Sequence, residues 1–393
     1  MKKMKKKIKK WYQKADKKIT IFLFRFLPRV CPLRTKKICF LSDSREVMGG
    51  NLGAIYDYLE NQDYQRVVMF KMDRRIKTSF FQKLKLIYTL VTSHYILLED
   101  MVAITTYLRV RKNQELVQLW HGPGAFKKFG FSRKTNGEKI GAIHTGYKKY
   151  TKAIVSSDAI KWCYAEAFSI SEEKIKATGF PRTDDFFHHD YLEKTKQSFY
   201  QKYPNLKDKK IILFAPTYRG TKVNDAAYDY SQLNFQQLYQ HFHDEYVMII
   251  KWHPMYYNNI ILGKQKAPDL SGYQDFFLDF SDYRDINDLL IVCDLLITDY
   301  SSMVFDYVLL NKPIIYFAYD LEQYTQYGGR GLYFDFDDYV YGKIAKNQDD
   351  LIDCIQYPEM MEDKRQKFIA QFMNACDGHS TEKTWNYISG RDD

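Results

Sequence analysis

Short apolar runs alternate with helix-like segments along most of the 393-residue chain, and this alternation restricts the fold more than any other feature. Such alternation is typical of right-handed βαβ units on a parallel sheet. A glycine-rich stretch, Gly49–Gly53, leads into an expected helix at Ala54–Glu60. The strands predicted in the first half are Lys37–Leu41, Arg66–Phe70, Tyr95–Leu98, Leu116–Leu119, Ala153–Ser156 and Ile175–Ala177.

The pattern starts again after a polar helix and linker at Tyr191–Lys210, with helices expected at Asn234–Tyr239 and Ser302–Leu310. The strands predicted there are Ile211–Phe214, Val247–Lys251, Phe276–Leu278, Leu295–Thr298 and Pro313–Phe317. Two Rossmann-like halves joined by a linker predict an α/β chain of GT-B architecture, in which two domains face each other across a cleft. Ligands in such sheets bind beyond the carboxyl ends of the strands.

We expect four segments along the chain. A basic amphipathic helix comes first, two Rossmann-like domains follow, and the final helices pack back toward the first domain. The predicted bounds are residues 1–34, 35–195, 205–355 and 356–393.

Positive charge is concentrated at the N terminus. The net charge is +11, and the first 37 residues carry +14, which leaves −3 for the rest of the chain. A protein that binds nucleic acid without sequence preference needs basic residues spread along a binding face. We therefore expect no nucleic-acid partner.

Apolar residues recur at helical spacing near the N terminus, and Pro28 is expected to end this helix. Lysines fill most intervening positions, so the helix suits the surface of an anionic membrane. The alternatives are a helix docked on its own protein and a signal peptide, although Arg25 interrupts the apolar part that a signal peptide needs. The apolar positions are Ile8, Trp11, Tyr12, Ala15, Ile19, Phe22, Leu23, Phe26 and Leu27.

Six cysteines occur without a C-x-x-C pair or metal-like spacing, which favours a reduced, cytosolic compartment. No stretch approaches the roughly 20 apolar residues that a spanning helix needs. The cysteines are Cys31, Cys39, Cys163, Cys293, Cys354 and Cys376.

The segment Leu295–Asp306 (LLITDYSSMVFD) joins an apolar strand to a predicted helix. Ser301 and Ser302 fall where capping hydroxyls and unpaired backbone N–H groups meet. Such a helix start can bind phosphate. A plain helix cap is the alternative interpretation.

Two Trp-His pairs follow predicted strands. His121 lies in a glycine-rich loop before two lysines, and the ordinary pKa of histidine near 6.5 suits it to remove a proton from a hydroxyl. His253 follows Lys251 in the second half, where either side chain could contact a phosphate. A structural histidine is the alternative in each case.

Two arginines add to this set, Arg219 at a strand end and Arg330 in a Gly-Gly-Arg-Gly loop. Together these residues indicate a polyanionic ligand. No carboxylate cluster for a metal is evident, and neither a Walker A loop nor the H-E-x-x-H or G-x-S-x-G motif is present.

The chain resembles the CDP-glycerol glycerophosphotransferase family, which builds teichoic acids and related capsule linkages. The resemblance runs from about Lys37 to Asp338. It is carried by LWHGPGAFKKFG, TGFPRTD, FAPTYRG, KWHP, LLITDYSSMVFDY, NKPIIYFAYD and RGLYFDF, in this order. It implies a GT-B enzyme at the cytoplasmic face of the membrane. Such an enzyme transfers glycerol phosphate or ribitol phosphate from a CDP-alditol to a lipid-linked saccharide, presumed to be undecaprenyl-linked, and releases CMP.

The resemblance also implies roles for individual residues, with the acceptor on the first domain and the donor on the second. His121 resembles the base that deprotonates the acceptor hydroxyl, and His253 resembles a ligand of the donor pyrophosphate. Donor or phosphate contacts are expected from Arg219, Lys251, Ser301, Ser302, Asp306 and Arg330. No metal and no tightly bound cofactor are expected.

Two other functions stay open on the sequence. One is a GT-B glycosyltransferase that uses a nucleotide sugar, and the other is a non-catalytic membrane adaptor. The sequence does not distinguish glycerol from ribitol, or priming from polymerisation. In the family that the chain resembles, long polymerases often carry an additional N-terminal domain. The four segments expected here do not include one, which favours priming.

Overall fold

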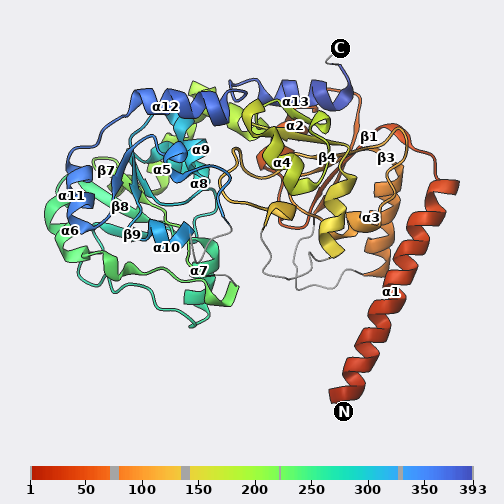
Figure 1. The fold of residues 1–393 in the computed structure, drawn as a ribbon, viewed down its shortest axis with the longest axis horizontal. Helices are drawn as coiled ribbons and strands as arrows, with labels where there is room; N and C mark the ends of the chain where they lie inside the picture. The colour runs from red at the N-terminus through yellow and green to blue at the C-terminus, as the bar shows by residue number, and fades with distance from the viewer. Residues whose placement is uncertain (1, 71–78, 134–141, 221–222, 326–330, 392–393) are drawn as a thin grey trace. The chain divides into compact units, whose positions relative to one another are not determined.

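The computed structural model describes residues 2–70, 79–133, 142–220, 223–325 and 331–391 (Figure 1). The chain forms two compact units, each built on one parallel sheet. Unit 1 comprises Met1–His121, Gly130–Arg182 and His379–Asp393, and unit 2 comprises Gly122–Phe129 and Thr183–Gly378. The predicted class of two parallel-sheet α/β domains is confirmed.

Unit 1 contains a six-stranded parallel sheet in the order β2-β1-β3-β4-β5-β6. Its core includes Ile38, Leu97 and Val117, all fully buried. The strands are β1 (Arg34–Ser42), β2 (Gln65–Phe70), β3 (Ser93–Leu98), β4 (Glu115–Gln118), β5 (Lys152–Val155) and β6 (Ile175–Ala177). The helices are α1 (Lys2–Val30), α2 (Gly50–Tyr58), α3 (Phe80–Thr92), α4 (Lys161–Phe168) and α13 (Ser380–Ser389).

The last helix of the chain, α13, belongs to unit 1. Its Trp385 is fully buried, with its ring edge-on to Tyr64 and Tyr95 at centroid distances of 5.2 and 5.3 Å. Lys152 of β5 donates hydrogen bonds of 2.9 Å to two carbonyls in the last turn of α13. The cation therefore satisfies carbonyls that a helix end leaves unpaired.

Unit 2 repeats this architecture, with a six-stranded parallel sheet in the order β12-β11-β10-β7-β8-β9. The strands are β7 (Lys210–Phe214), β8 (Tyr246–Ile250), β9 (Phe277–Asp279), β10 (Leu295–Thr298), β11 (Ile314–Phe317) and β12 (Lys343–Ala345). The helices are α5 (His189–Lys202), α6 (Phe235–Phe242), α7 (Pro254–Ile261), α8 (Ile286–Val292), α9 (Val304–Tyr307), α10 (Leu321–Gln323), α11 (Gln348–Gln356) and α12 (Glu362–Phe368).

The segment Gly122–Phe129, which directly follows His121, packs in unit 2. The Phe126 ring stacks on Tyr339 at 4.1 Å, and the Tyr339 hydroxyl donates to the carbonyl of Ala125 at 2.7 Å. Gly124 has φ +71°, and a Cβ there would lie 2.4 Å from the ring of Phe305. Only glycine allows this close approach.

All eleven strands predicted from the apolar runs are present. β12, a three-residue edge strand in which only Ala345 is fully buried, was not predicted. The predicted helix Ser302–Leu310 is wrong in its start, because α9 begins at Val304 and is followed by the 3₁₀ turn Val308–Leu310. α2 starts at Gly50, so the glycine-rich stretch forms the first turn of that helix.

The N-terminal helix α1 runs to Val30, so the prediction that Pro28 ends it is wrong. Pro28 removes one backbone donor, but the helical hydrogen bond from Cys31 N to Leu27 O (2.8 Å) is still made. The helix ends before Pro32, since the residue that precedes a proline disfavours helical geometry.

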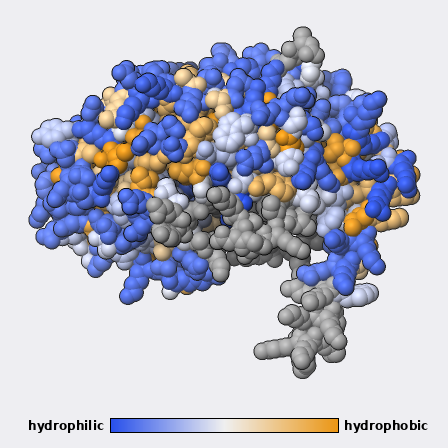
Figure 2. All heavy atoms as spheres, in the orientation of Figure 1, coloured by the Kyte–Doolittle hydropathy of each residue, from blue (hydrophilic) through white to orange (hydrophobic). Residues whose placement is uncertain are grey.

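α1 packs on α3, and this contact uses residues outside the predicted apolar stripe. Thr20 and Phe24 are each 2% exposed, and Asp16 forms a 2.6 Å ion pair with Lys83 of α3. A second helical row is exposed and lies among hydrophilic side chains (Figure 2). Its members are Trp11, Ile19, Phe22, Phe26 and Val30. Within the described part of the chain, no helix has the length and apolar character needed to cross a bilayer.

Candidate active site

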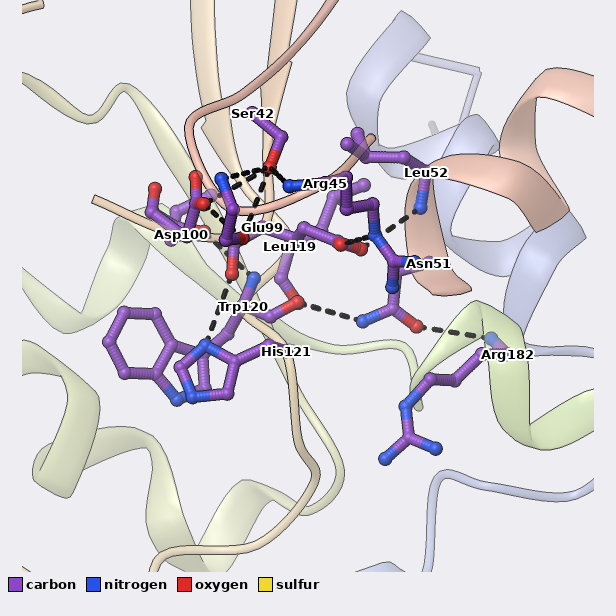
Figure 3. A network of polar contacts seen from close by, with 12 residues as sticks. Ser42, Arg45, Asn51, Leu52, Glu99, Asp100, Leu119, Trp120, His121 and Arg182 are labelled. Carbon is purple, nitrogen blue, oxygen red and sulfur yellow. Dashed lines mark hydrogen bonds and ion pairs between the residues drawn. The ribbon is translucent and has the colours of Figure 1, made fainter. Parts of the chain in front are cut away.

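The loop after β4 carries His121, and loops from neighbouring strand ends of unit 1 surround it. Because the carboxyl ends of parallel strands meet at one edge, residues that follow β1, β3, β4 and β6 converge there. Figure 3 shows this convergence around His121.

His121 is held through its Nδ1 atom, which lies 3.2 Å from the backbone carbonyl oxygen of Glu99. A carbonyl oxygen only accepts hydrogen bonds, so Nδ1 carries the ring hydrogen of the neutral imidazole. The lone pair is therefore on Nε2. This geometry equips Nε2 to accept a proton from a hydroxyl.

Trp120, the residue before His121, has a φ of 55°. This left-handed conformation is rare for a bulky residue and costs about 1–3 kcal/mol. The side chain of Gln118 accepts a hydrogen bond from Trp120 N at 2.8 Å. The Trp120 ring lies 4.4 Å from the ring of His121 and 5.4 Å from that of Phe168. Strain is thus stored in the turn that presents His121.

Glu99 provides the carbonyl for His121, and its own carboxylate is buried beside Arg45. That carboxylate also accepts a hydrogen bond from Leu52 N at 3.4 Å, at the start of α2. Gly50 has φ +59°, and a Cβ there would lie 1.9 Å from the Arg45 guanidinium and 3.0 Å from the carboxylate. Glycine is favoured here by this left-handed φ, and it also leaves room for the ion pair.

In unit 2, Arg219 joins three strand-end loops. Its guanidinium donates to both carboxylate oxygens of Asp320, at 2.6 and 2.8 Å, and to Asp299 at 2.9 Å. Asp299 in turn accepts from the backbone N–H groups of Thr217 (2.8 Å) and Tyr300 (2.6 Å). The loops after β7, β10 and β11 are therefore fixed by one cation.

The surroundings of Arg219 keep it charged. Burial alone would lower the pKa of Arg219, but Asp299 and Asp320 outweigh burial and raise this pKa above its ordinary value. Tyr300 and Tyr324 lie 5.1 and 5.0 Å from the guanidinium, at cation–π distance. Burial and the nearby Asp320 raise the pKa of Tyr300, so its hydroxyl stays protonated and donates to Asp320.

His253 caps α7, and its Nδ1 accepts a hydrogen bond from Met255 N at 3.2 Å. An Nδ1 atom that accepts has no hydrogen, so the hydrogen of the neutral ring is on Nε2. The ring of Tyr218 lies 4.6 Å away. Lys251 turns to the loop after β9, where it donates to the carbonyls of Ser281 (2.8 Å) and Tyr283 (2.7 Å).

The two serines of the LLITDYSS segment differ in exposure. Ser301 is 8% exposed, and its hydroxyl accepts from Met303 N at 3.3 Å, whereas Ser302 is exposed. The cap position of α9 is Met303, so the expectation that the serines cap a long helix is wrong. α9 has four residues, so hydroxyl groups offer more to an anion here than a helix dipole. Asp306 is buried within α9.

The predicted residues thus fall into two sets. His121 lies in unit 1, while Arg219, Lys251, His253, Ser301, Ser302 and Asp306 belong to unit 2. Arg330 lies outside the described residues. Among the described residues, no group of three or more His, Cys, Asp or Glu side chains is arranged to hold a metal ion.

Sequence reasoning missed the residues that hold His121 and Arg219. Glu99, Gln118 and Asn51 support the His121 loop, and Asp299 and Asp320 bind Arg219. Asp299 was visible in the TDYSS motif. Gln118 directly precedes LWHGPGAFKKFG and Asp320 ends NKPIIYFAYD, but neither motif points to its partner. Glu99 and Asn51 lie far along the chain from the residues that they contact.

Comparison with known proteins extends these findings. Residues 23–390 match the family model of CDP-glycerol:poly(glycerophosphate) glycerophosphotransferase. A teichoic acid poly(ribitol-phosphate) polymerase of Bacillus spizizenii is 39% identical over 95% of this chain, and the chain spans 60% of that relative's length. A teichoic acid ribitol-phosphate primase of the same species is 32% identical over 93% of this chain and 94% of the primase.

Among solved structures, the wall teichoic acid polymerase TagF has a TM-score of 0.73, with 22% sequence identity. The match covers 91% of this chain and 90% of that one. At this identity the likeness bears on the fold alone, and it agrees with the predicted GT-B class. The match over residues 23–390 shows that this chain belongs to the CDP-glycerol:poly(glycerophosphate) glycerophosphotransferase family.

Proposed function

We propose that this chain transfers an alditol phosphate from a CDP-alditol to a hydroxyl of a lipid-linked teichoic acid or capsule precursor, with release of CMP. Family membership supports the reaction class. The observation that carries the chemistry is the contact of His121 Nδ1 with the carbonyl of Glu99, which places the lone pair of the neutral ring on Nε2.

In the proposed reaction, Nε2 of His121 takes the proton of the acceptor hydroxyl. The acceptor oxygen then forms a bond to the β-phosphorus of the donor, which carries the alditol. The bond from this phosphorus to the bridging oxygen breaks, and CMP leaves with the electron pair. Positioned proton removal contributes about 10²–10⁴-fold to such rates.

On the donor side, we assign the phosphate contacts mainly to Ser301, Ser302 and His253. The Ser302 hydroxyl is exposed, and Nε2 of neutral His253 carries a hydrogen that can be donated to a phosphate oxygen. Because protein oxygens already engage Arg219 and Lys251, we assign these two cations to holding the loops near the phosphates.

Asp306 and Arg330 remain predicted donor-side residues. Asp306 follows the serines on α9.

We propose ribitol phosphate as the preferred unit, with glycerol phosphate as the second candidate. The 39% and 32% identical relatives both carry ribitol phosphate in their names. One is a polymerase and the other a primase, so the number of units added is a separate question for the same assay.

We also propose that α1 lies on the cytoplasmic face of an anionic membrane, near the lipid-linked acceptor and its undecaprenyl carrier. The exposed row on α1 supports this, since Trp11 and Phe22 are 66% and 60% exposed. Lys14 and Arg25 are exposed on the same helix. Exposed aromatics beside cations suit the headgroup region of a bilayer.

Membrane binding can be measured by co-sedimentation with vesicles of phosphatidylcholine, with and without about 30% phosphatidylglycerol. We expect binding only with the anionic lipid, and a clear reduction when Trp11 and Phe22 are both changed to Ser. Tyr357→Ser, which changes an exposed aromatic of unit 2, is the control. Equal binding to both vesicle types would argue against the proposed surface.

The function is tested by CMP release from CDP-ribitol, CDP-glycerol and a panel of UDP-sugars, each with and without a lipid-linked acceptor. We expect acceptor-dependent CMP release, faster with CDP-ribitol. Release of UDP instead would support the nucleotide-sugar glycosyltransferase, and no release from any donor would support the membrane adaptor.

A further inference from the structure

We infer that Asn51 is a positioning residue that holds the His121 loop in its reactive conformation. The inference rests on the proposed role of His121 and adds to it the group that sets the ring orientation. Asn51 is fully buried in the first turn of α2, far from His121 in the sequence.

The amide of Asn51 ties two strand-end loops together. Its Nδ2 donates to the carbonyl of Trp120 at 2.9 Å and to that of Leu119 at 3.4 Å, both after β4. Its Oδ1 accepts from Arg182 N at 3.1 Å, in the loop after β6 (Figure 3). One side chain therefore satisfies three backbone groups at the edge of the sheet that carries His121.

Asn51 and Gln118 together hold the strained residue Trp120. Gln118 accepts from its N–H at 2.8 Å, and Asn51 donates to its carbonyl at 2.9 Å. A left-handed φ of 55° persists only where the surroundings over-determine it. With one of the two amides removed, the turn can relax and carry the His121 ring away from the carbonyl of Glu99.

The chain path makes this support more important. His121 is the last residue of a unit 1 segment, and the next eight residues, Gly122–Phe129, pack in unit 2. The loop is thus held after His121 by contacts of unit 2, and before His121 by Asn51. Asn51 therefore keeps His121, the proposed base, attached to the sheet of unit 1.

Asn51 itself is placed by the buried pair of Glu99 and Arg45. The Glu99 carboxylate accepts from Leu52 N, and Gly50 leaves the room that the pair needs. Glu99 therefore acts on His121 by two routes, directly through its carbonyl and indirectly through the start of α2.

The chain offers a matched control in Gln114, at the amino end of the same strand. Gln114 is 2% exposed. Its Nε2 donates to the carbonyls of Leu90 and Ser93, both at 2.7 Å, and its Oε1 accepts from Arg111 N at 3.3 Å. Both residues are buried amides with two carbonyl acceptors and one N–H donor, but they serve opposite ends of β4.

The test compares Asn51→Leu with Gln114→Met, which keep side-chain size and remove hydrogen bonding. Both should lose similar thermal stability. Only Asn51→Leu should reduce kcat, by about 10–100-fold with the donor KM within about threefold, since small misplacements of a reacting group cost about 10²-fold. If Asn51→Leu does not fold, Asn51→Ala is used, because it leaves room for water to solvate the three backbone groups.

A second measurement is independent of turnover. The ¹⁵N shifts of the His121 ring, assigned by comparison with His121→Gln, should show hydrogen on Nδ1 in the wild type and in Gln114→Met. The Asn51 variant should show a mixture of tautomers. Hydrogen on Nε2 in the wild type, an unchanged tautomer in the Asn51 variant, or equal kcat losses in both variants would overturn the inference. If the wild type releases no CMP, the proposed function fails, and the ring shifts still decide the role of Asn51.

Discussion

The same dipeptide, Trp-His, follows a parallel strand in each unit, yet the two histidines are held in opposite ways. In unit 1, Nδ1 of His121 faces a backbone carbonyl, so Nε2 holds the lone pair. In unit 2, Nδ1 of His253 faces a backbone N–H, so Nε2 carries the hydrogen. One ring is prepared to accept a proton and the other to donate a hydrogen bond. The backbone group opposite Nδ1, rather than the motif, decides which.

The supports of the two sites differ as well. Around His121 the groups in direct contact with the strained turn are buried amides and a carbonyl, and the Glu99–Arg45 ion pair lies behind them. In unit 2 the support is a charge network, in which Arg219 binds two carboxylates. A neutral support sets an orientation, whereas a buried ion pair also ties stability to the charge that it balances.

The largest expected effect comes from removing the base. His121→Ala should lower kcat by about 10²–10⁴-fold, because the proposed acceptor of the proton is removed. Binding of the CDP-alditol, measured by calorimetry, should stay within about threefold. Near-normal turnover in this variant would show that His121 is not the proton acceptor, and the proposed difference between the two histidines would then be wrong.

Arg219→Met should destabilise unit 2 by about 3–5 kcal/mol, because Asp299 and Asp320 would stay buried without their cation. Denaturant unfolding measures this change. Lys210→Met, which breaks an exposed ion pair with Glu245 in the same unit, should cost less than about 1 kcal/mol. If Arg219→Met kept its stability and lost only donor affinity, the guanidinium would act on the ligand rather than on the loops.

His253→Ala should weaken CDP-alditol binding by about 10–100-fold, the range expected when a hydrogen bond to a charged group is lost. Its kcat should change less than that of His121→Ala. His253→Asn should keep the cap of α7, since asparagine also caps helices, and should therefore lose donor affinity without the loss of stability. His241→Ala, an exposed histidine of unit 2, is the control. Unchanged donor affinity in both His253 variants would contradict the proposed donor role.

The smallest expected effect is a pH dependence confined to unit 1. Burial lowers the pKa of His94 in β3 below 6.5, although the nearby Glu115 opposes this shift, and Lys152 adds to it. Between that lowered value and 6.5, the unfolded chain binds more protons than the folded one, so stability rises with pH. The stability that His94 contributes is complete above pH 6.5 and is lost as the pH falls through the pKa of His94 in the folded chain.

Hydrogen exchange of β3 and β8 amides, corrected for intrinsic rates, measures this effect. Protection of β3 should decrease between pH 7.5 and 5.5 more than protection of β8 does. His94→Gln should remove the difference. An equal decrease in protection of β3 and β8 would show that His94 does not cause the pH dependence.

Most of the fold was predictable from the sequence, because strands in a parallel sheet are buried on both faces and appear as apolar runs. This held for β10, a central strand that is buried along its whole length and matches its predicted bounds. It failed for β12 and for the start of α9, where tight turns at Ser301–Met303 replace the expected helical turn. Local periodicity does not report such details.

The two histidines, both serines and Arg219 could be named in advance because each stands at the end of an apolar run, where parallel strands expose their loops. The chemistry of His121 and Arg219 could not, because it depends on partners distant in sequence. Glu99 lies 22 residues from His121, Asn51 lies 69 from Trp120, and Asp320 lies 101 from Arg219. Such partners meet only when the sheet assembles. The amino-acid order therefore gives the residues that act, and the folded sheet assigns each a donor, an acceptor or a charge.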